Sequence, residues 1–489
     1  MRLRLVGHDY KYAVEQIMLS VFPDEKPQYA EAPFLGSGEL FTESRLRFGS
    51  VYAQATTVLH CNCKIFRGNA RVSNRKLNGK LVTDRLLQKI IKQSFYRAAS
   101  QYVEGPPPWG SLTGIRPSHI AATAIMSGKS AESAKKLLIR EYYVSPERAH
   151  ICTQTAQASL ALKDSLLPKD IALYIGIPFC PTRCSYCSFV SNSVEKSFDM
   201  IASFVDVLLD EIAIAAKTTQ ELGLSISSVY VGGGTPTTLS EDSLEAILSK
   251  LHSSFDLSNI REFTFEAGRP DTITPMKLEI IRRYGADRIC VNPQSMSDKV
   301  LSAIGRKHSA EDFIKAVQLV KKSGAKLNID IIAGLPADTI ESFKNTVEAI
   351  VSFFPENVTV HTLSLKKGSR IMLDGTQIPS GKDVEAMLSY SSARLSNSGF
   401  YPYYLYRQKY TSGGFENIGW CIPGHEGIYN ISMMEELCTV LALGGGGVTK
   451  LVSAQGRIER IFNAKYPREY ILFTDKLSEK YAKILNFYS

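Results

Sequence analysis

The chain has 489 residues, of which 44% are hydrophobic and 21% are charged, as in ordinary globular proteins of two or three domains. No apolar run could span a membrane, the N-terminus lacks the apolar core of a signal peptide, and nine cysteines do not fit a secreted disulfide framework. We therefore expect a cytoplasmic protein. Its net charge of +9 favours acidic ligands but does not by itself indicate nucleic acid, which we do not expect as a partner.

The first 100 residues are predicted to be α+β. Alternating apolar residues indicate strands at 3–6, 44–48 and 51–65, and helical spacing of apolar residues indicates a helix over 81–98. The basic stretch 67–80 is either a patch for nucleic acid or another acidic ligand, or a solvated hairpin loop. The loop is favoured because no aromatic residues interleave with the charges. Two thiols on one face of the strand predicted over 51–65, Cys61 and Cys63, suggest buried apolar groups rather than ligands.

Residues 105–110, Gly-Pro-Pro-Pro-Trp-Gly, separate this region from three predicted helices that end near residue 164. The last helix begins at Ser145 and Pro146, an N-cap followed by proline at the first helical position. A short linker around Pro168 comes next. We therefore assign residues 1–165 to an N-terminal α+β domain, whose role the sequence does not indicate.

From residue 171 strands and helices alternate. The predicted strands are 171–177, 226–231, 260–266, 287–291, 327–332 and 357–363, and the predicted helices are 196–217, 240–254, 274–284, 309–324 and 338–353. Six strands alternating with helices predict a parallel sheet with right-handed crossovers. Such sheets place their ligand sites at the carboxyl ends of the strands, where the motifs described next also lie.

The first of these strands leads into three cysteines, Cys180, Cys184 and Cys187, at C-x3-C-x2-C spacing. A loop of this length can fold three thiolates around one metal centre. Because a structural zinc site or a cubane cluster takes four ligands, three thiolates predict a [4Fe–4S] cluster with one iron left open. The alternatives are a zinc site that borrows a distant ligand and three ordinary buried thiols.

The second strand ends in a triple-glycine turn, residues 232–234, followed by Thr235. Glycines there let backbone amides approach a carboxylate or phosphate closely. Such a turn, one helix after a cysteine triad, resembles the radical S-adenosylmethionine (SAM) superfamily, in which SAM chelates the open iron. The resemblance implies an α/β fold in which residues 166–370 form a partial (β/α)6 barrel, and two cofactors, a [4Fe–4S] cluster and SAM.

Residues 171 to about 450 are similar to the HemN/HemW/HemZ group of that superfamily, which includes oxygen-independent coproporphyrinogen III oxidase. The HemZ branch is nearest, since it shares the segment Trp109–Pro117 and the strand end Glu266–Thr272. The resemblance assigns the cluster to Cys180, Cys184 and Cys187. It assigns SAM contacts to Tyr174, Phe179, Tyr186, Gly233, Gly234, Thr235, Glu266, Gln294, Arg306 and Asp330, of which Tyr174 and Arg306 are the implied catalytic residues. Helix capping is the alternative role for Glu266 and Asp330.

The implied activity is oxygen-independent oxidative decarboxylation of coproporphyrinogen III propionates to vinyl groups, through a 5′-deoxyadenosyl radical, in haem biosynthesis. Two departures weaken the transfer: Gly176 stands where the oxidase branch has histidine, and Phe189 where it has a fourth cysteine. A haem-binding chaperone of HemW type and a radical SAM enzyme acting on haem are the alternatives. A nucleic-acid radical SAM enzyme is a weaker one, in which the basic N-terminal third would bind RNA.

The implied substrate is a tetrapyrrole with propionates, and the implied electron donor is a protein such as flavodoxin or ferredoxin. Propionates require cations, and the candidates are Arg269, Arg306, Lys366, Lys367 and Arg370, although 366–370 is also typical of a solvated loop. His361 is either a substrate or haem contact or a buried core histidine.

The residues after 370 are assigned to a C-terminal α/β extension, 371–489, that closes the substrate site. A helix at 384–396 and a strand at 400–406 are followed by a Gly- and Tyr-rich segment, 413–427, a helix at 432–437 and a Gly-rich loop, 441–448. Gly-rich loops with aromatic residues suit a lid over a flat substrate. The alternative is a segment that docks on the open edge of the barrel, and both interpretations can hold together.

Overall fold

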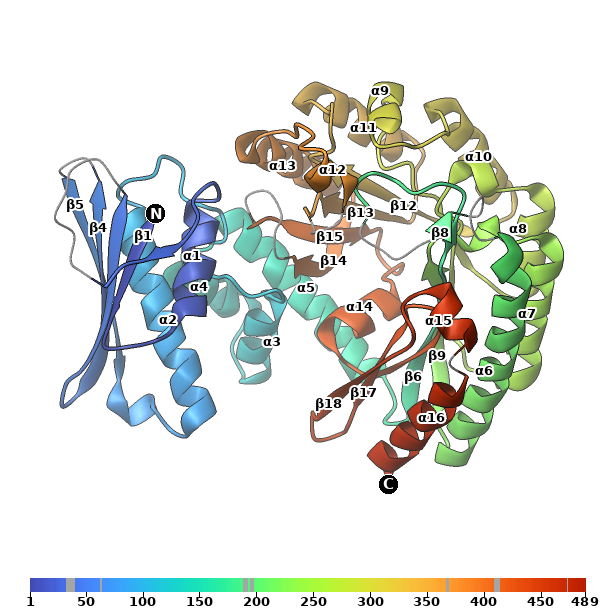
Figure 1. The fold of residues 1–489 in the computed structure, drawn as a ribbon, viewed down its shortest axis with the longest axis horizontal. Helices are drawn as coiled ribbons and strands as arrows, with labels where there is room; N and C mark the ends of the chain where they lie inside the picture. Colours follow the sequence, from blue (N-terminus) through green and yellow to red (C-terminus); the bar gives the residue numbers. More distant parts are fainter. Residues whose placement is uncertain are drawn as a thin grey trace. The chain divides into compact units, whose positions relative to one another are not determined.

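The computed structural model of the chain describes residues 1–31, 40–61, 64–187, 192–193, 198–365, 369–408, 414–472 and 474–489. These residues form two units: Met1–Thr153 with Arg407–Phe415, and Gln154–Tyr406 with Glu416–Ser489. Figure 1 shows both. The predicted domain limits near 165 and 370 stay predictions. The predictions for Cys63, Phe189, Lys366 and Lys367 lie outside the described residues.

The first unit contains a five-stranded sheet of order β2-β1-β3-β4-β5. The strands are β1 (Arg2–Val6), β2 (Gln28–Tyr29), β3 (Phe41–Phe48), β4 (Tyr52–Cys61) and β5 (Lys64–Ser73). One face packs against α1 (Lys11–Val21) and α2 (Lys80–Ala99), with Ala53, Ala55 and Leu59 of β4 in the shared core. Helix α2 lies close to β5 because position 68 is glycine, where an added Cβ would lie 2.0 Å from the carbonyl oxygen of Ser94.

Two predictions for this unit were wrong. The strand predicted over 51–65 is two strands, β4 and β5, which pair antiparallel from Tyr52–Ser73 to Cys61–Lys64. Residues 67–73, predicted as a loop, form most of β5, because polar and charged residues alternate there with the small or apolar residues Gly68, Ala70 and Val72 that face the helices. Helix α1 was not predicted, whereas the helix over 81–98 is confirmed as α2.

The three helices predicted after the Pro-rich segment are confirmed as α3 (Ser118–Met126), α4 (Ala131–Tyr142) and α5 (Pro146–Ser165). The predicted cap of the last is also confirmed, since the hydroxyl of Ser145 accepts the backbone N–H of Arg148 at 3.2 Å.

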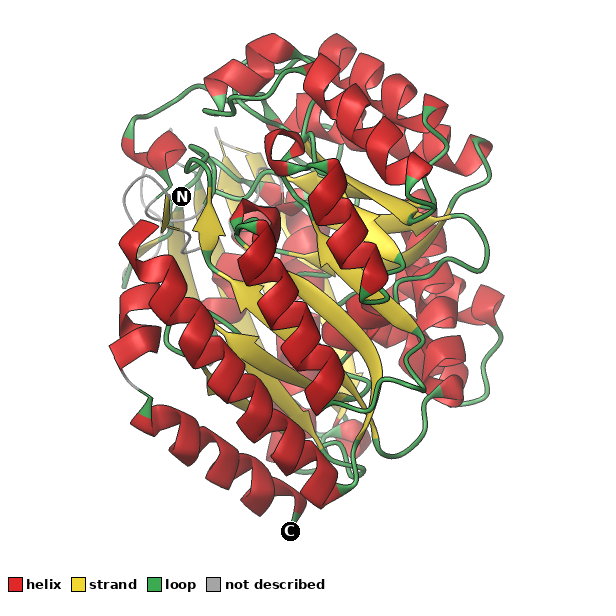
Figure 2. Ribbon diagram, turned by 90° about the vertical axis from the view of Figure 1, so that its right-hand side faces the viewer, coloured by secondary structure: helices red, strands yellow, loops and turns green. Residues whose placement is uncertain are grey.

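The second unit is built on an eleven-stranded sheet of order β14-β15-β13-β12-β11-β10-β9-β6-β16-β17-β18. Its middle holds the six predicted parallel strands as neighbours: β6 (Asp170–Ile177), β9 (Ser225–Gly233), β10 (Glu262–Glu266), β11 (Arg288–Cys290), β12 (Lys326–Ala333) and β13 (Asn357–Thr362). Figure 2 shows helices packed along this sheet. The connecting helices are α6 (Ile201–Leu222), α7 (Glu241–Ser254), α8 (Pro275–Arg283), α9 (Asp298–Ala303), α10 (Ala310–Lys322) and α11 (Ile340–Ser352), of which only α9 was not predicted.

The C-terminal extension lengthens this sheet at both ends. At one end β15 (Glu416–Cys421) pairs antiparallel with β13, and β14 (Tyr401–Arg407) lies beyond it. At the other end β16 (Thr439–Gly444) pairs parallel with β6 and is followed by β17 (Val448–Val452) and β18 (Ile458–Phe462). Hydrogen bonds among the described strands thus run in one open order and do not close the predicted barrel. The helices of the extension are α12 (Arg370–Leu373), α13 (Gly381–Asn397), α14 (Ile428–Glu435), α15 (Pro467–Leu472) and α16 (Asp475–Tyr488).

The prediction that residues 413–427 form a lid loop was wrong for 416–421, which form the buried strand β15. Both faces of this strand are covered, so its sequence lacks the alternation that marks a half-exposed strand. Gly419 is needed within it, because an added Cβ would lie 1.8 Å from the ring of Tyr404.

None of the helices in the described ranges is long and apolar enough to cross a membrane.

Candidate functional site

The cysteine loop and the glycine turn are joined by backbone hydrogen bonds at the carboxyl ends of β6 and β9. After β6 the chain enters the short strand β7 (Phe179–Cys180). The backbone N–H of Gly234 donates to the carbonyl of Ile177, and that of Thr235 to the carbonyl of Phe179, both at 2.7 Å. An added Cβ at Gly234 would lie 2.4 Å from the Phe179 oxygen, so glycine is required there. The hydroxyl of Thr235 lies 3.5 Å from Cys180 Sγ, which brings the two motifs together.

The second cysteine of the loop contacts a buried arginine. Arg269 Nη1 donates to Cys184 Sγ at 3.8 Å and to the hydroxyl of Thr182 at 3.1 Å. Its Nε and Nη2 bind the two carboxylate oxygens of Asp271 at 3.1 and 3.2 Å. The Arg269 side chain is 3% exposed. Its donors therefore bind the cysteine loop and Asp271, and this is not the exposed cation that a propionate contact needs.

Arg306 lies half-buried beside Tyr186, the residue before the third cysteine of the same loop. Its Nη1 donates to the carbonyl of Asn292 at 2.6 Å and its Nη2 to the hydroxyl of Tyr186 at 3.0 Å. Burial raises the pKa of Tyr186, which keeps its proton on the oxygen. Burial, followed by the charges of Arg306 and Arg269, lowers the pKa of His308 to about 4, so this neighbour is neutral. His308 therefore adds no positive charge to those of Arg269 and Arg306 beside the cysteine loop.

Two carboxylates of the site lie on β10 and β12, the strands on either side of β11. Glu266 ends β10 and accepts the hydroxyl of Tyr230 at 2.7 Å. Burial raises the pKa of Glu266 to about 7; the Tyr230 hydrogen bond opposes this rise and the charge of Asp330 adds to it. Asp330, on β12, accepts the amide of Asn328 at 2.9 Å and lies 3.5 Å from His361 Nε2. These contacts are with strand residues, so neither carboxylate caps a helix through the contacts described here.

Gln294 lies between these strands in a conformation that is rare for its type. Its φ is +69°, its backbone N–H donates to the carbonyl of Asp330 at 3.2 Å, and its carbonyl accepts from Ile332 at 3.0 Å. The side-chain Oε1 of Gln294 and the Nε of Arg306 are buried and have no hydrogen-bond partner among the described residues. Buried polar atoms without partners beside two carboxylates indicate a place for a polar ligand.

Sequence reasoning missed two tyrosines that stack on Tyr174. The ring centroid of Tyr174 lies 6.3 Å from that of Tyr230 and 6.0 Å from that of Tyr429, and the last two are 4.4 Å apart. Tyr230 lies two residues before the glycine turn, a signal that could have identified it. Tyr429 lies on α14, and no motif links it to the site.

The residues fit a metal–sulfur group with an attached polar ligand. Cys180, Cys184 and Cys187 are free of disulfides. In the described ranges no three His, Cys, Asp or Glu side chains are already grouped as a metal site. The loop nevertheless supplies three sulfurs, and the buried Arg269 beside Cys184 compensates the charge of a thiolate. Gln294 Oε1 and Arg306 Nε, which have no partner among the described residues, can hydrogen-bond to a polar ligand.

A family model, curated proteins and a solved structure all relate this chain to radical SAM proteins. Residues 174–350 match the radical SAM superfamily. The chain is 36% identical over 369 residues, 74% of each chain, to the oxygen-independent coproporphyrinogen-III oxidase-like protein HemZ of Bacillus subtilis. It is 25% identical over 329 residues, 65% of this chain and 83% of the other, to the heme chaperone HemW of Buchnera aphidicola. The solved structure of coproporphyrinogen III oxidase (HemN) from Escherichia coli matches with a TM-score of 0.51 and 20% identity over 65% of this chain and 72% of that one, a likeness of fold alone.

Proposed function

Because the chain belongs to the HemN/HemW/HemZ group of radical SAM proteins, we propose that it decarboxylates the propionates of coproporphyrinogen III to vinyl groups. The observation that carries this proposal is the similarity, over 74% of the chain, to a protein named for its likeness to that oxidase. Proteins of the superfamily generally use a [4Fe–4S] cluster and SAM. The substrate of the proposed reaction is a tetrapyrrole with propionates, and the electron donor is a flavodoxin or ferredoxin.

In this proposal Cys180, Cys184 and Cys187 hold the cluster. The bound cofactors would supply one-electron reduction of SAM and hydrogen abstraction from the substrate, and loss of carbon dioxide would then pass one further electron to an acceptor. The protein positions SAM: the glycine turn and Arg306 bind its carboxylate, and Glu266 binds its amino group. Asp330 and Gln294 bind the ribose hydroxyls, Tyr174 contacts SAM near the cluster, and Phe179 and Tyr186 exclude water from the cluster. Of the cations suggested for the propionates, the exposed one among the described residues is Arg370, at the start of α12.

Anaerobic turnover of the reconstituted protein tests the proposal. With coproporphyrinogen III, SAM, a reductant and a one-electron acceptor, we expect vinyl products over multiple turnovers, together with 5′-deoxyadenosine. Deoxyadenosine without a decarboxylated tetrapyrrole would contradict it.

A haem chaperone of HemW type is the second candidate, and Gly176 favours it. An added Cβ at Gly176 would lie 2.8 Å from the backbone carbonyl oxygen of Gly445. The turn between β16 and β17 therefore occupies the space beside the position where the oxidase branch carries histidine. Stable, stoichiometric haem binding by a sample that makes no vinyl product would select the chaperone.

The affinity for SAM is expected to rise with pH through about 7. Burial raises the pKa of Glu266 to about 7, so the carboxylate is largely protonated below that pH and ionised above it. The ionised carboxylate accepts hydrogen bonds from the SAM amino group more strongly than the protonated form does, so the affinity increases as the proton leaves. Anaerobic calorimetric titrations at several pH values measure this. A Glu266→Gln variant that kept the same rise would show that another group is responsible.

Replacing Arg269 by glutamine is expected to make the cluster harder to reduce. The variant loses a buried positive charge and the N–H···S contact to Cys184, and both favour the reduced, more negative cluster. A tenfold fall in the reduced fraction at fixed potential corresponds to about 59 mV for one electron. Spectroscopically monitored redox titration measures the midpoint. Arg283→Gln, on the exposed side of α8, is the control, and equal midpoints in the two variants would refute the role.

A further inference from the structure

The net positive charge of this protein is concentrated in its N-terminal third. Residues 1–153 contain 22 Lys and Arg against 12 Asp and Glu, a net charge of +10, whereas the remaining residues contain 35 against 36. Between Glu43 and Asp84 there are eight Lys and Arg and no acidic residue. A charge imbalance of this size between parts of one chain is typical of proteins with a polyanionic partner.

Strand alternation gathers these charges on one face of the first unit's sheet, which we call the arginine face. It is the face opposite α1 and α2, and it carries Arg4 of β1, Arg45 and Arg47 of β3, and Arg67 and Arg71 of β5. The single acidic residue in these strands and β4 is Glu43, which is bound by Arg4 at 2.8 Å and by Arg45 at 2.5 Å. Arg47, Arg67 and Arg71 are exposed. The face is thus positive across neighbouring strands.

The side chains between the arginines are polar and aromatic. Arg47 and Arg71 flank Gln54, and Arg45 and Asn69 flank Thr56, in rows across β3, β4 and β5. The guanidinium of Arg71 lies 4.8 Å from the ring centroid of the half-exposed Tyr52. The aromatic residue that is absent within the linear stretch 67–80 is therefore supplied from the neighbouring strand. Arginine forks, hydrogen-bonding amides and an aromatic platform on an open sheet are the features that bind single-stranded RNA.

We propose that the arginine face binds single-stranded RNA. A membrane surface is the other large polyanion, but it would require apolar side chains in the plane of contact, where this face presents Gln54, Thr56 and Asn69. Of the exposed apolar residues of the region, Phe48 and Val51 lie at the β3–β4 turn, and Ile65 lies on the arginine face near the start of β5, two residues before Arg67. None of these residues is among those proposed for SAM and the cluster, and the inference does not depend on the reaction.

The test measures binding of the full-length protein to a fluorescein-labelled oligouridylate of about 20 nucleotides by fluorescence anisotropy over a range of salt concentrations. The face variant combines Arg47→Gln, Arg67→Gln and Arg71→Gln. The matched control removes the same charge from the same unit, with Lys129→Gln, Lys136→Gln and Arg140→Gln around α4, all exposed. For the face variant we expect at least a tenfold weaker Kd at low salt and a slope of log Kd against log salt that is smaller by about 2, since each lost phosphate contact removes about 0.7. The control is expected to stay within about twofold of the unchanged protein.

Three further experiments show which results would contradict RNA binding by the arginine face. Equal loss in the face and control variants, tighter binding of the matching DNA, or no binding of RNA would overturn the proposal. Binding to phosphatidylserine vesicles that depends on the arginine face, without RNA binding, would replace it with a membrane site. If the face variant does not fold, ultraviolet crosslinking of the unchanged protein to the same RNA decides: crosslinks within β4 or β5 support the proposal, and crosslinks confined to other segments overturn it.

Discussion

A Cys184→Ala variant is expected to lose the iron–sulfur cluster and with it all turnover. Three thiolates are the minimum set for a cubane cluster with an open iron, so removing one leaves two. Changes to residues that only hydrogen-bond to metal ligands already reduce metal affinity or activity by about 10- to 100-fold. The loss of a ligand itself should therefore reduce them by more than about 100-fold. Iron and sulfide analysis, together with electron paramagnetic resonance of the reduced protein, measures the effect.

A matched cysteine change separates ligand loss from damage to the fold. Cys421→Ala alters a buried thiol on β15 and is expected to keep the cluster. A Cys184→Ala protein with unchanged iron content and spectrum would show that the cysteine loop is not the cluster site. Retention of zinc instead of iron in the unchanged protein, purified without oxygen, would favour the zinc alternative.

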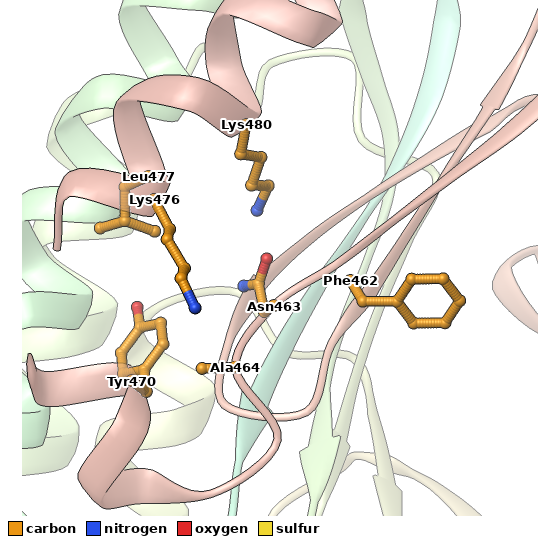
Figure 3. Close-up of a pocket in the computed structure, with 7 residues that line it drawn as sticks. All are labelled: Phe462, Asn463, Ala464, Tyr470, Lys476, Leu477 and Lys480. Atoms are coloured by element: carbon orange, nitrogen blue, oxygen red, sulfur yellow. The ribbon is translucent and has the colours of Figure 1, made fainter. Parts of the chain in front are cut away.

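Replacing Glu211 by alanine is expected to destabilise the second unit by about 3–5 kcal/mol, the usual result of leaving one member of a buried ion pair unpaired. Glu211, on α6, is fully buried and lies 2.7 Å from the ammonium of Lys480, whose side chain is 4% exposed. The same carboxylate accepts the backbone N–H of Gly444 at 2.8 Å, the amide of Asn463 at 3.2 Å and the hydroxyl of Tyr470. Figure 3 shows Lys480, Asn463 and Tyr470 around the small cavity beside this pair.

Urea unfolding of the protein, followed by circular dichroism, measures this change. Glu221→Ala, at an exposed position of the same helix, is the control and should stay within about 0.5 kcal/mol. A double variant, Glu211→Leu with Lys480→Met, should recover much of the loss, since well-packed apolar residues replace a buried pair at little cost. If Glu211→Ala lowers the free energy of unfolding by less than about 1 kcal/mol, water or another group must solvate the ammonium charge of Lys480.

The Glu211 network also bears on the candidate site. Gly444, which it holds, lies against β6, because an added Cβ at Gly444 would lie 2.2 Å from the carbonyl oxygen of Gly176. The network therefore fixes the C-terminal extension to the strand that carries Tyr174 and leads to the cysteine loop. We expect the Glu211→Ala variant to bind SAM more weakly for this reason, even where it remains folded.

The sequence by itself determined the features that depend on neighbouring residues. The spacing of Cys180, Cys184 and Cys187 and the glycine turn are local, and so are the helix caps at Ser240, Thr274 and Ser309, whose hydroxyls each accept a backbone N–H three residues on. The six central strands and their helices follow from periodicity, which needs only a few turns of chain to appear. Placement of the motifs at strand ends then follows from the rule for parallel sheets.

Only the tertiary structure decided contacts between residues far apart in the chain. Tyr429 joins Tyr174 and Tyr230 because α14 of the extension lies against β9, and Arg269 turns from a predicted propionate contact into a partner of Cys184. Strands β15 and β16 extend the sheet at opposite ends. Because both faces of each strand are buried, their sequences lack the polar–apolar alternation that would have predicted them. The arginine face likewise exists only once β3, β4 and β5 pair in register. Such contacts depend on strand order and register, which are set by the packing of the whole chain and not by any one segment.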